Sequence, residues 1–369
     1  MIGIDTPAWR VYLYAAMKTY RHLYSRICSF ENLYLAYRAA RRGKRQHASV
    51  AAFEYDQESE LLRLRDELQS QTWQPGAYHS FYIHDPKRRL ISAAPFRDRV
   101  VHHALVNVIE PIWEARFIHD TYANRMGKGT HRALDRCQQF ARRWRYVLQC
   151  DIRQYFPSID HALLRAELAR LIRDDCALEL CDRIIASGVG VLAEQYDMQW
   201  FPGDDLTAAF RPRGLPIGNL TSQFWANVYL HRFDHFVKRD LKCAGYVRYV
   251  DDCLLFGDDK TQLHRWRAAC IDALAGLRLR LHEGRAQVYP VTNGIPFLGF
   301  RVYPTHRRLK RRNGVNFQRR LTALLARLTR REIGLDQLHA GVLGWINHAR
   351  YGDTFGLRRA LLCQQIIPA

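Results

Sequence analysis

Three aspartates stand where strands are expected to end. In the segment 245–257, two β-favouring runs flank Asp251 and Asp252, and a glycine closes each end. This pattern predicts a hairpin with the Asp pair at its tip. Asp151 follows the apolar run 146–150, which predicts a short buried strand. Because aspartates are common in turns for conformational reasons, the pair alone does not indicate a function.

The three carboxylates suggest one kind of chemistry if the two strands are neighbours. Close carboxylates repel each other unless cations neutralise them. Carboxylate oxygens are hard ligands and favour Mg²⁺. Two such ions about 3.5–4 Å apart stabilise the attacking and leaving oxygens of an in-line phosphoryl transfer. The sequence is therefore compatible with metal-assisted phosphoryl transfer.

Composition and charge point to a polyanionic partner. The 369 residues include 56 Lys and Arg against 36 Asp and Glu, for a formal charge of +20, while 48% are hydrophobic. Nucleic acid is the simplest partner for such a charge excess. An acidic membrane is the rival, but no basic amphipathic anchor, apolar span or secretion signal is evident. The nine cysteines are scattered without a Cys-x-x-Cys pair, which is typical of reduced thiols in a cytoplasmic protein.

The elements around the aspartates can be outlined from apolar periodicity and turn residues. We expect a helix at 54–71, strands at 81–83 and 89–91, a helix at 98–109 ended by Pro111, a glycine-rich basic loop at 122–130, helices at 163–172 and 176–185, a turn-rich insertion at 187–212, helices at 218–239 and 260–276, and further strands up to residue 303. Helical patterns follow the basic run 306–312.

Several motifs occur in the order used by one enzyme family. The Tyr-Val-Asp-Asp segment 249–252 resembles the catalytic box of reverse transcriptases, and 150–159 resembles their other metal-binding strand. The segment 213–223 falls between them, and 297–300 is similar to the strand near the primer grip. The segment 87–100 resembles the fingers of bacterial retroelement enzymes.

The resemblance implies a fold and a domain plan. The expected fold class is α+β, a right-hand polymerase whose fingers and palm contain an antiparallel sheet. The expected domains are an N-terminal helical extension rich in basic and aromatic residues at 1–53, fingers and palm at 54–305, and a helical thumb at 306–369. After Ala369 we expect no RNase H, endonuclease or integrase module.

The resemblance also implies roles for individual residues. Asp151 and Asp251 would be the main ligands of two Mg²⁺ ions, with Mn²⁺ as an acceptable substitute, Asp252 assisting and the Ile152 carbonyl available. The expected dNTP contacts are Lys87, Arg89, Tyr155, Phe156, Ile217, Gly218, Gln223 and Arg285. The expected primer and template contacts are Arg125, Lys128, Tyr249, Leu298 and Gly299.

Three of these positions have open alternatives. Phe156 would be a steric gate that excludes a ribose 2′-hydroxyl, or else a core aromatic. Lys87 and Arg89 would contact the triphosphate as charged donors, or else be solvated. Arg285 stands where many of these enzymes have a lysine near the leaving pyrophosphate. Because arginine does not readily give up a proton, electrostatic stabilisation is the role left to it.

The segment 217–223 narrows the subfamily. Its Ile-Gly start and Ser-Gln end resemble the enzymes of diversity-generating retroelements, as does the thumb segment 344–354. Those enzymes copy a template-repeat RNA into cDNA with errors at adenines, together with a small basic accessory protein whose stoichiometry the sequence leaves open. Ile217 offers only apolar contact, and a site without polar partners discriminates less sharply between similar substrates. Simple packing of Ile217 on the nucleotide is the alternative.

The same motifs are compatible with other functions. The expected partners are template RNA, the RNA/cDNA duplex and dNTPs. The expected location is the cytoplasm, for a protein encoded by a bacterium or a phage. An anti-phage or group II intron-like reverse transcriptase would share the same boxes. A different class of function is an RNA-binding scaffold with a silent polymerase centre. The retained Asp151, Asp251 and Asp252 argue against that scaffold, because a silent centre has no need of clustered like charges.

Overall fold

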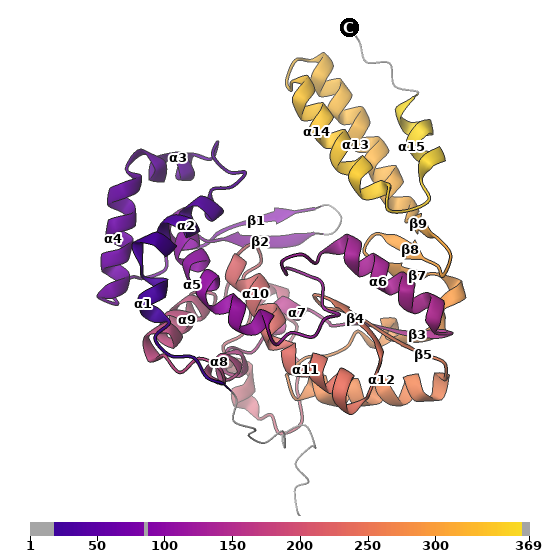
Figure 1. Ribbon diagram of the computed structural model, residues 1–369, viewed down its shortest axis with the longest axis horizontal. Coiled ribbons are helices and arrows are strands. Elements are labelled where there is room, and N and C mark those ends of the chain that lie inside the picture. Colours follow the sequence, from indigo (N-terminus) through magenta and orange to yellow (C-terminus); the bar gives the residue numbers. More distant parts are fainter. Residues whose placement is uncertain (1–17, 85–87, 364–369) are drawn as a thin grey trace, which may run out of the picture. The chain divides into compact units, whose positions relative to one another are not determined.

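The computed structural model describes residues 18–84 and 88–363 (Figure 1). The chain forms two compact units that interleave along the sequence. The first takes its described residues from Met1–His119, Asp151–Lys242 and Ala268–Glu283, and the second from Asp120–Cys150, Cys243–Arg267 and Gly284–Ala369. The domain boundaries expected at 53/54 and 305/306 stay a prediction.

The first unit is mainly helical and carries one hairpin. Its elements are α1 (Tyr24–Ile27), α2 (Phe30–Ala40), α3 (Ala48–Tyr55), α4 (Gln57–Gln69), β1 (His79–Ile83), β2 (Arg89–Ala93), α5 (Phe96–Glu114), α7 (Tyr155–Ser158), α8 (His161–Ala169), α9 (Asp175–Ser187), α10 (Leu220–Tyr229) and α11 (His231–His235). Helix α5 is at its centre, because α2 and α10 both pack against it and most of its apolar side chains are buried. The antiparallel β1–β2 pair confirms the two strands expected at 81–83 and 89–91.

Helix α5 does not end before Pro111, so the expected end at residue 109 is wrong. Pro111 lies inside the helix, which runs on to Glu114. A proline in a helix lacks an N–H and costs about 3 kcal/mol. Burial of Ile112 and Trp113 just beyond it, with exposed fractions of 6% and 0%, offsets that cost. Tertiary packing therefore overrides the local break signal.

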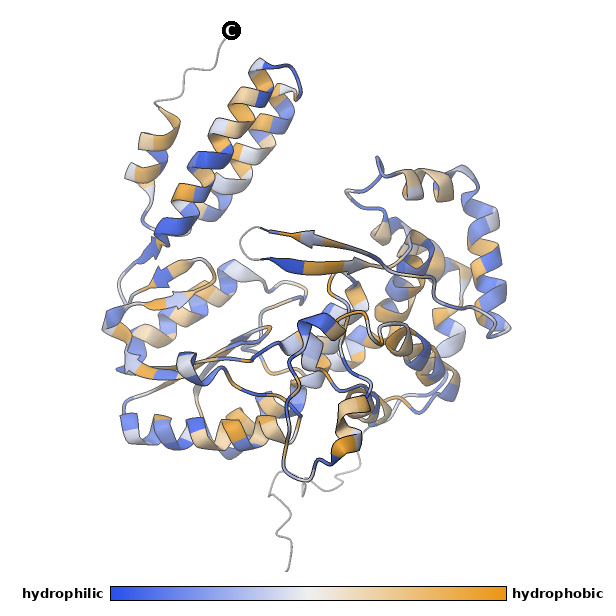
Figure 2. Ribbon diagram, turned by 180° about the vertical axis from the view of Figure 1, so that it is seen from behind, coloured by the Kyte–Doolittle hydropathy of each residue, from blue (hydrophilic) through white to orange (hydrophobic). Residues whose placement is uncertain are grey.

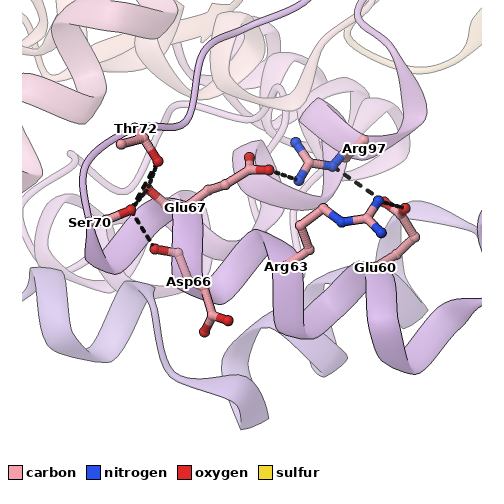
Figure 3. Close-up of polar contacts among 7 residues, drawn as sticks. All are labelled: Glu60, Arg63, Asp66, Glu67, Ser70, Thr72 and Arg97. Carbon is pink, nitrogen blue, oxygen red and sulfur yellow. Dashed lines mark hydrogen bonds and ion pairs between the residues drawn. The ribbon is translucent and has the colours of Figure 1, made fainter.

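Helix α4, with its buried Leu61, Leu64 and Leu68, confirms the helix expected at 54–71. Two ion pairs also join it to α5. Arg97 of α5 reaches Glu67 at 2.8 Å and Glu60 at 3.4 Å on α4, and Figure 3 shows its guanidinium between the two carboxylates. Such partly exposed pairs contribute little each, so burial of the three leucines, on a helix that packs against α2 and α3, contributes most to the position of α4.

The second unit is built on a four-stranded sheet in the order β4-β5-β3-β6. Its members are β3 (Tyr146–Asp151), β4 (Gly245–Tyr249), β5 (Asp252–Gly257) and β6 (Gln287–Pro290), and a second sheet contains β7 (Ile295–Phe297), β8 (Phe300–Val302) and β9 (Arg307–Leu309). Helix α6 (Thr130–Arg143) packs on β4, β5 and β8. One apolar cluster joins α6 to both sheets.

The last helices of the second unit have their own small core. They are α13 (Arg311–Thr329), α14 (Leu335–Ala349) and α15 (Phe355–Leu362). Phe317, Leu321 and Leu338 are buried between them, and the Phe317 ring stacks on Trp345 with centroids 3.9 Å apart. Figure 2 shows apolar and hydrophilic residues interspersed along these helices, as expected for helices that each bury one face.

Two other expectations meet the structure differently. The helix expected at 218–239 is broken into α10, α11 and a π-helical turn, η4 (Phe236–Asp240), while α12 (Lys260–Ala275) agrees with the helix expected at 260–276. The insertion at 187–212 contains only the short 3-10 turns η2 (Ala193–Gln195) and η3 (Leu206–Phe210) after α9, as its turn-rich composition predicts. All nine cysteines lie in the part of the chain that is described, and no disulfide joins them.

Candidate active site

The β4–β5 hairpin presents one aspartate in its turn and one in its second strand. Tyr249 pairs with Asp252, so the two-residue turn consists of Val250 and Asp251. The expectation that both aspartates form the tip is therefore wrong by one position. Composition alone placed the turn on the polar pair, whereas cross-strand pairing fixes the register.

Val250 has a backbone conformation that β-branched residues rarely adopt. Its φ is +57°, in the left-handed region. Such conformations cost about 1–3 kcal/mol and persist only where the surroundings impose them. They concentrate at functional sites, and here the strained residue immediately precedes Asp251.

Asp151 is the last residue of β3, and β3 lies next to β5 in the sheet order. Its carbonyl accepts a hydrogen bond from the His282 N–H at 2.7 Å, and the Arg153 N–H donates to the Arg280 carbonyl at 2.8 Å. Ile152 between them is buried. These backbone bonds hold the chain extended just past the end of the strand, so the direction in which Asp151 leaves the sheet is fixed.

The donor set suits a hard divalent cation. Asp151 ends β3, Asp252 begins the neighbouring β5, and Asp251 occupies the turn before it. Carboxylate oxygens of this kind favour Mg²⁺ over softer metals. Within residues 18–84 and 88–363, no group of three or more His, Cys, Asp or Glu side chains is arranged so that it could hold a metal ion. The three-carboxylate cluster therefore stays a prediction.

Phe156 and Tyr155 form a short helix just after β3. The Phe156 ring is half-buried and lies edge-on to Tyr155, with centroids 5.6 Å apart. The Phe156 carbonyl accepts from the Leu215 N–H at 3.0 Å, which ties α7 to the segment that leads into residues 217–223. Tyr155 is buried and its hydroxyl donates to the Ala226 carbonyl, so the ring that contacts Phe156 is itself fixed.

The segment 217–219 is fixed to β2 by its backbone and by one side chain. The Ser92 N–H donates to the Ile217 carbonyl at 2.8 Å. Asn219 is buried, accepts from the Ala94 N–H at 3.0 Å and donates to the Ser92 carbonyl at 2.8 Å. Gly218 has φ +119°, and a Cβ there would lie 2.9 Å from Ile91. The half-buried Ile217 is thereby held in one place.

Asn219 is a residue whose role the sequence did not reveal. Its side chain satisfies backbone groups of Ser92 in β2 and of Ala94 directly after it, more than a hundred positions earlier in the chain. The available signal was an asparagine directly after a glycine at a helix start, which suggests an ordinary helix cap. Asn219 is the N-cap residue of α10, but its side chain does not cap the helix. Gln223 lies one turn further along the same helix and is half-buried.

The basic residues expected at the triphosphate are not all described. Lys87 lies outside the described residues. Arg89 is exposed at the start of β2, opposite Ile83 of β1. Arg285 is exposed in a 3-10 turn, η5 (Glu283–Arg285), directly before β6. Their expected contacts with a nucleotide stay a prediction.

The expected primer and template contacts fall in two groups within the second unit. Arg125 and Lys128 lie in the glycine-rich loop before α6, and Tyr249 is joined to that loop because its hydroxyl is 3.1 Å from the Thr130 hydroxyl. Leu298 and Gly299 form the two-residue turn between β7 and β8, since Phe297 pairs with Phe300. Both turn residues have positive φ, +45° and +89°.

Comparison with known proteins gives a family and several relatives. The family model described as reverse transcriptase (RNA-dependent DNA polymerase) matches residues 83–302. Protein YkfC of Escherichia coli K12 is 28% identical over 317 residues, covering 72% of this chain and 79% of YkfC. The group II intron-encoded protein LtrA of Lactococcus lactis subsp. cremoris is 25% identical over 183 residues, covering 49% of this chain and 28% of LtrA.

Among solved structures, a telomerase from Candida albicans aligns with a TM-score of 0.43 at 11% identity. The alignment covers 79% of this chain and 62% of the telomerase chain. A search of the described helices finds none that is both long enough and apolar enough to cross a membrane.

Proposed function

The chain belongs to the reverse transcriptase family, and on that premise we propose that it makes adenine-mutagenised cDNA from a template-repeat RNA for a diversity-generating retroelement. The premise rests on the family match to residues 83–302, which is more than half of the chain. It confirms the enzyme class expected from the motifs, an RNA-directed DNA polymerase that uses an RNA template, and the right-hand α+β fold class.

The observation that supports the mutagenic subtype is the fixed position of Ile217. Hydrogen bonds from Ser92 to its carbonyl, and from Asn219 to β2, hold this residue in place at 217–219. Because the backbone at residue 217 is fixed, the Ile217 side chain offers the incoming nucleotide an apolar surface and no hydrogen-bond partner. Sites that lack such a partner separate similar substrates by only about 10- to 200-fold. Such a surface would lower fidelity in general, and the placement of the errors at adenine comes from the resemblance of 217–223 and 344–354 to enzymes of diversity-generating retroelements.

Reverse transcriptase domains generally use divalent metal ions. In the proposed reaction Asp151, Asp251 and Asp252, with the Ile152 carbonyl, would hold two Mg²⁺ ions, which Mn²⁺ can replace. When bound, the ions favour attack of the primer 3′-hydroxyl on the α-phosphate and departure of pyrophosphate.

The remaining residues bind and select the nucleotide. Phe156 stands against the sugar and excludes a 2′-hydroxyl. Lys87, Arg89 and Arg285 neutralise the triphosphate as charged hydrogen-bond donors. Arg285 does so without giving up a proton. The dNTPs, the RNA/cDNA duplex and a small basic accessory protein are the proposed partners, in the cytoplasm.

The test is sequencing of cDNA made by the purified protein with its RNA and any accessory protein. Wild type, Asp251→Asn and Ile217→Gln are compared, with Asp336→Asn at an exposed position of α14 as the matched carboxylate control. We expect errors clustered at template adenines for wild type and Asp336→Asn, cleaner cDNA for Ile217→Gln and none for Asp251→Asn. Equal error rates for wild type and Ile217→Gln would contradict the proposed role of Ile217.

A group II intron-like or anti-phage reverse transcriptase is the second candidate. The similarity to LtrA, a group II intron-encoded protein, favours it. Accurate cDNA from the wild type, with no excess of errors at adenine, would select this candidate over the mutagenic one. Absence of cDNA from every variant, with RNA binding retained, would instead select a scaffold with a silent centre.

A further inference from the structure

Arg248 has an unusual environment for an arginine in a strand. It lies in β4, and its exposed fraction is 1%, among the largest fully buried side chains of the second unit. Arginine is rarely buried to this extent, because removal of its charge from water is costly. An arginine is therefore retained here for a specific contact rather than for apolar packing.

That contact is to the turn of the hairpin. One terminal guanidinium nitrogen of Arg248 donates to the Val250 carbonyl at 2.9 Å. Val250 is the residue with φ +57°, and its carbonyl belongs to the peptide that links it to Asp251. A charged hydrogen bond in a buried setting is strong. It fixes the orientation of the peptide directly before the aspartate.

The backbone of Arg248 is held from outside the sheet. Strand β4 is at the edge of the sheet, and its free edge is covered by residues 120–122. The Arg248 N–H donates to the Asp120 carbonyl at 3.0 Å, and its carbonyl accepts from the Tyr122 N–H at 3.0 Å. Both the backbone and the side chain of Arg248 are thus fixed.

Residues 120–130 are themselves braced. The buried Asp120 carboxylate accepts hydrogen bonds from Arg136 of α6 at 2.8 and 3.1 Å, and from the Tyr122 hydroxyl at 3.1 Å. At the other end of the segment, the Thr130 hydroxyl contacts that of Tyr249 at 3.1 Å. The segment therefore contacts both residues of β4 that precede the turn, Arg248 and Tyr249.

We propose that Arg248 is a positioning residue that, with the segment 120–130, holds the Val250–Asp251 peptide in its strained conformation and so fixes the Asp251 carboxylate for catalysis. The proposal rests on the proposed role of Asp251. It also couples the turn to Arg125 and Lys128, which lie in the same segment.

The test combines Arg248→Met with relief of the strain at residue 250. Arg248→Met keeps an unbranched apolar stem but loses the donor. We expect primer extension to fall about 10- to 100-fold, the cost of a small misplacement of a reacting group, with a several-fold higher Mg²⁺ midpoint. Glycine adopts positive φ without a steric cost. The double variant Arg248→Met/Val250→Gly should therefore recover part of the lost rate.

A readout without metal separates positioning from simple loss of structure. Hydrogen exchange of amides 249–253 in the metal-free protein should quicken at least about tenfold in Arg248→Met, while amides in α6 and α14 stay protected. Arg142→Met is the matched control. It removes an exposed arginine of α6 that also donates to a backbone carbonyl, that of Pro304. This control should match wild type in rate, Mg²⁺ midpoint and exchange.

The outcomes are distinct from those that test the active site itself. Full activity of Asp251→Asn would overturn the proposed site. If Asp251→Asn is inactive but Arg248→Met has wild-type activity and exchange, only the positioning role fails. The positioning role also fails if Arg248→Met loses activity solely in proportion to its unfolded fraction, without a change in Mg²⁺ midpoint and without rescue by Val250→Gly.

Discussion

Two hairpins in the second unit have turns of the same length, but different contacts hold the two turns in place. Each has a two-residue turn that begins with a bulky residue at positive φ, Val250 in β4–β5 and Leu298 in β7–β8. The usual sequences for such turns contain glycine, asparagine or aspartate at positive φ. Both hairpins therefore pay a conformational cost, and something else in the structure must hold each of them.

The first turn is held by a residue of its own strand and by a segment that covers the edge of that strand. Arg248 hydrogen-bonds the Val250 carbonyl, and residues 120–122 cover the edge of β4. The second turn is held by elements that follow it in the chain. The Gly299 carbonyl accepts from the Lys310 N–H at 3.0 Å and from the Asn313 side chain at 3.2 Å, at the start of α13. The first turn is thus fixed through its own strand and the segment that covers the edge of that strand, whereas the second is fixed by docking on the C-terminal helices.

The largest expected effect is on activity, and it should occur in the first hairpin only. Asp251→Asn removes one negative charge from the turn of the first hairpin. In the proposed reaction that carboxylate is a metal ligand, and metal ions contribute several kcal/mol to such reactions. We expect primer extension to fall by about a thousandfold or more, with an unchanged melting temperature. Substitution of Leu298 by Ala in the second turn should reduce activity far less. Equal losses of activity in both variants would contradict a catalytic role that is specific to the first hairpin.

The next largest effect concerns stability. Gly299 has φ +89°, and a Cβ there would lie 2.8 Å from Asn313 and 3.2 Å from His348. Gly299→Ala should therefore lower the free energy of unfolding by about 1–3 kcal/mol, measured by denaturant titration.

Gly344→Ala is the matched control for Gly299→Ala. Gly344 lies in α14 with open space around its Cβ position, so alanine should be neutral or stabilising by up to about 1 kcal/mol. If Gly299→Ala is as stable as Gly344→Ala, docking on α13 and α14 does not hold the second turn.

Sequence patterns predicted the local elements of both hairpins but not what holds them. Alternating and apolar runs gave the strands around Asp251 and the strand before Asp151, because such signals depend on near neighbours. The register of the turn depends on pairing across strands, and it placed Asp252 in β5 rather than at the tip.

The long-range contacts were beyond sequence reasoning for the same reason. Asn219 meets β2, and residues 120–122 meet β4, over separations of more than a hundred positions. No spacing rule encodes such partners. A partial signal existed for Arg248, since a lone arginine within the apolar run 245–250 predicts either an edge position or a buried ion, and the structure shows both.

A pH effect should distinguish the second hairpin from the first. Burial lowers the pKa of His348, which packs beside Gly299, and burial also lowers the pKa of His131, which stacks on Tyr351. A folded-state pKa below the unfolded value means that the stabilisation is fully present above about pH 6.5 and is lost as the pH falls towards the folded pKa. Intrinsic amide exchange slows as the pH falls, so the quantity compared is the protection factor, the ratio of the intrinsic to the observed rate. Between pH 7.5 and 5.5, the protection factors of amides 298–300 should fall more than those of amides 249–252.

The control for the pH effect is His348→Gln. Glutamine does not titrate in this range, so in this variant the protection factors of amides 298–300 should differ less between the two pH values than in wild type.

A second origin of acid sensitivity lies in the first unit. Burial lowers the pKa of His102 in α5 to about 3, which reduces global stability by about 2 kcal/mol between pH 7 and pH 5. Global loss affects both hairpins equally, so only the difference between them reports on docking.

The smallest effect concerns the strain itself. Val250→Gly removes the cost of a β-branched residue at positive φ and should stabilise the protein by about 1 kcal/mol at most. Leu298→Gly removes a similar cost, but Leu298 also packs against the main apolar cluster of the second unit. Loss of that packing offsets the gain, so the net change should be near zero or slightly unfavourable. Chemical denaturation of the two variants tests this order. A larger increase in the free energy of unfolding for Leu298→Gly than for Val250→Gly would mean that the second turn is the more strained. Docking on α13 and α14 would then hold a more strained backbone than Arg248 does.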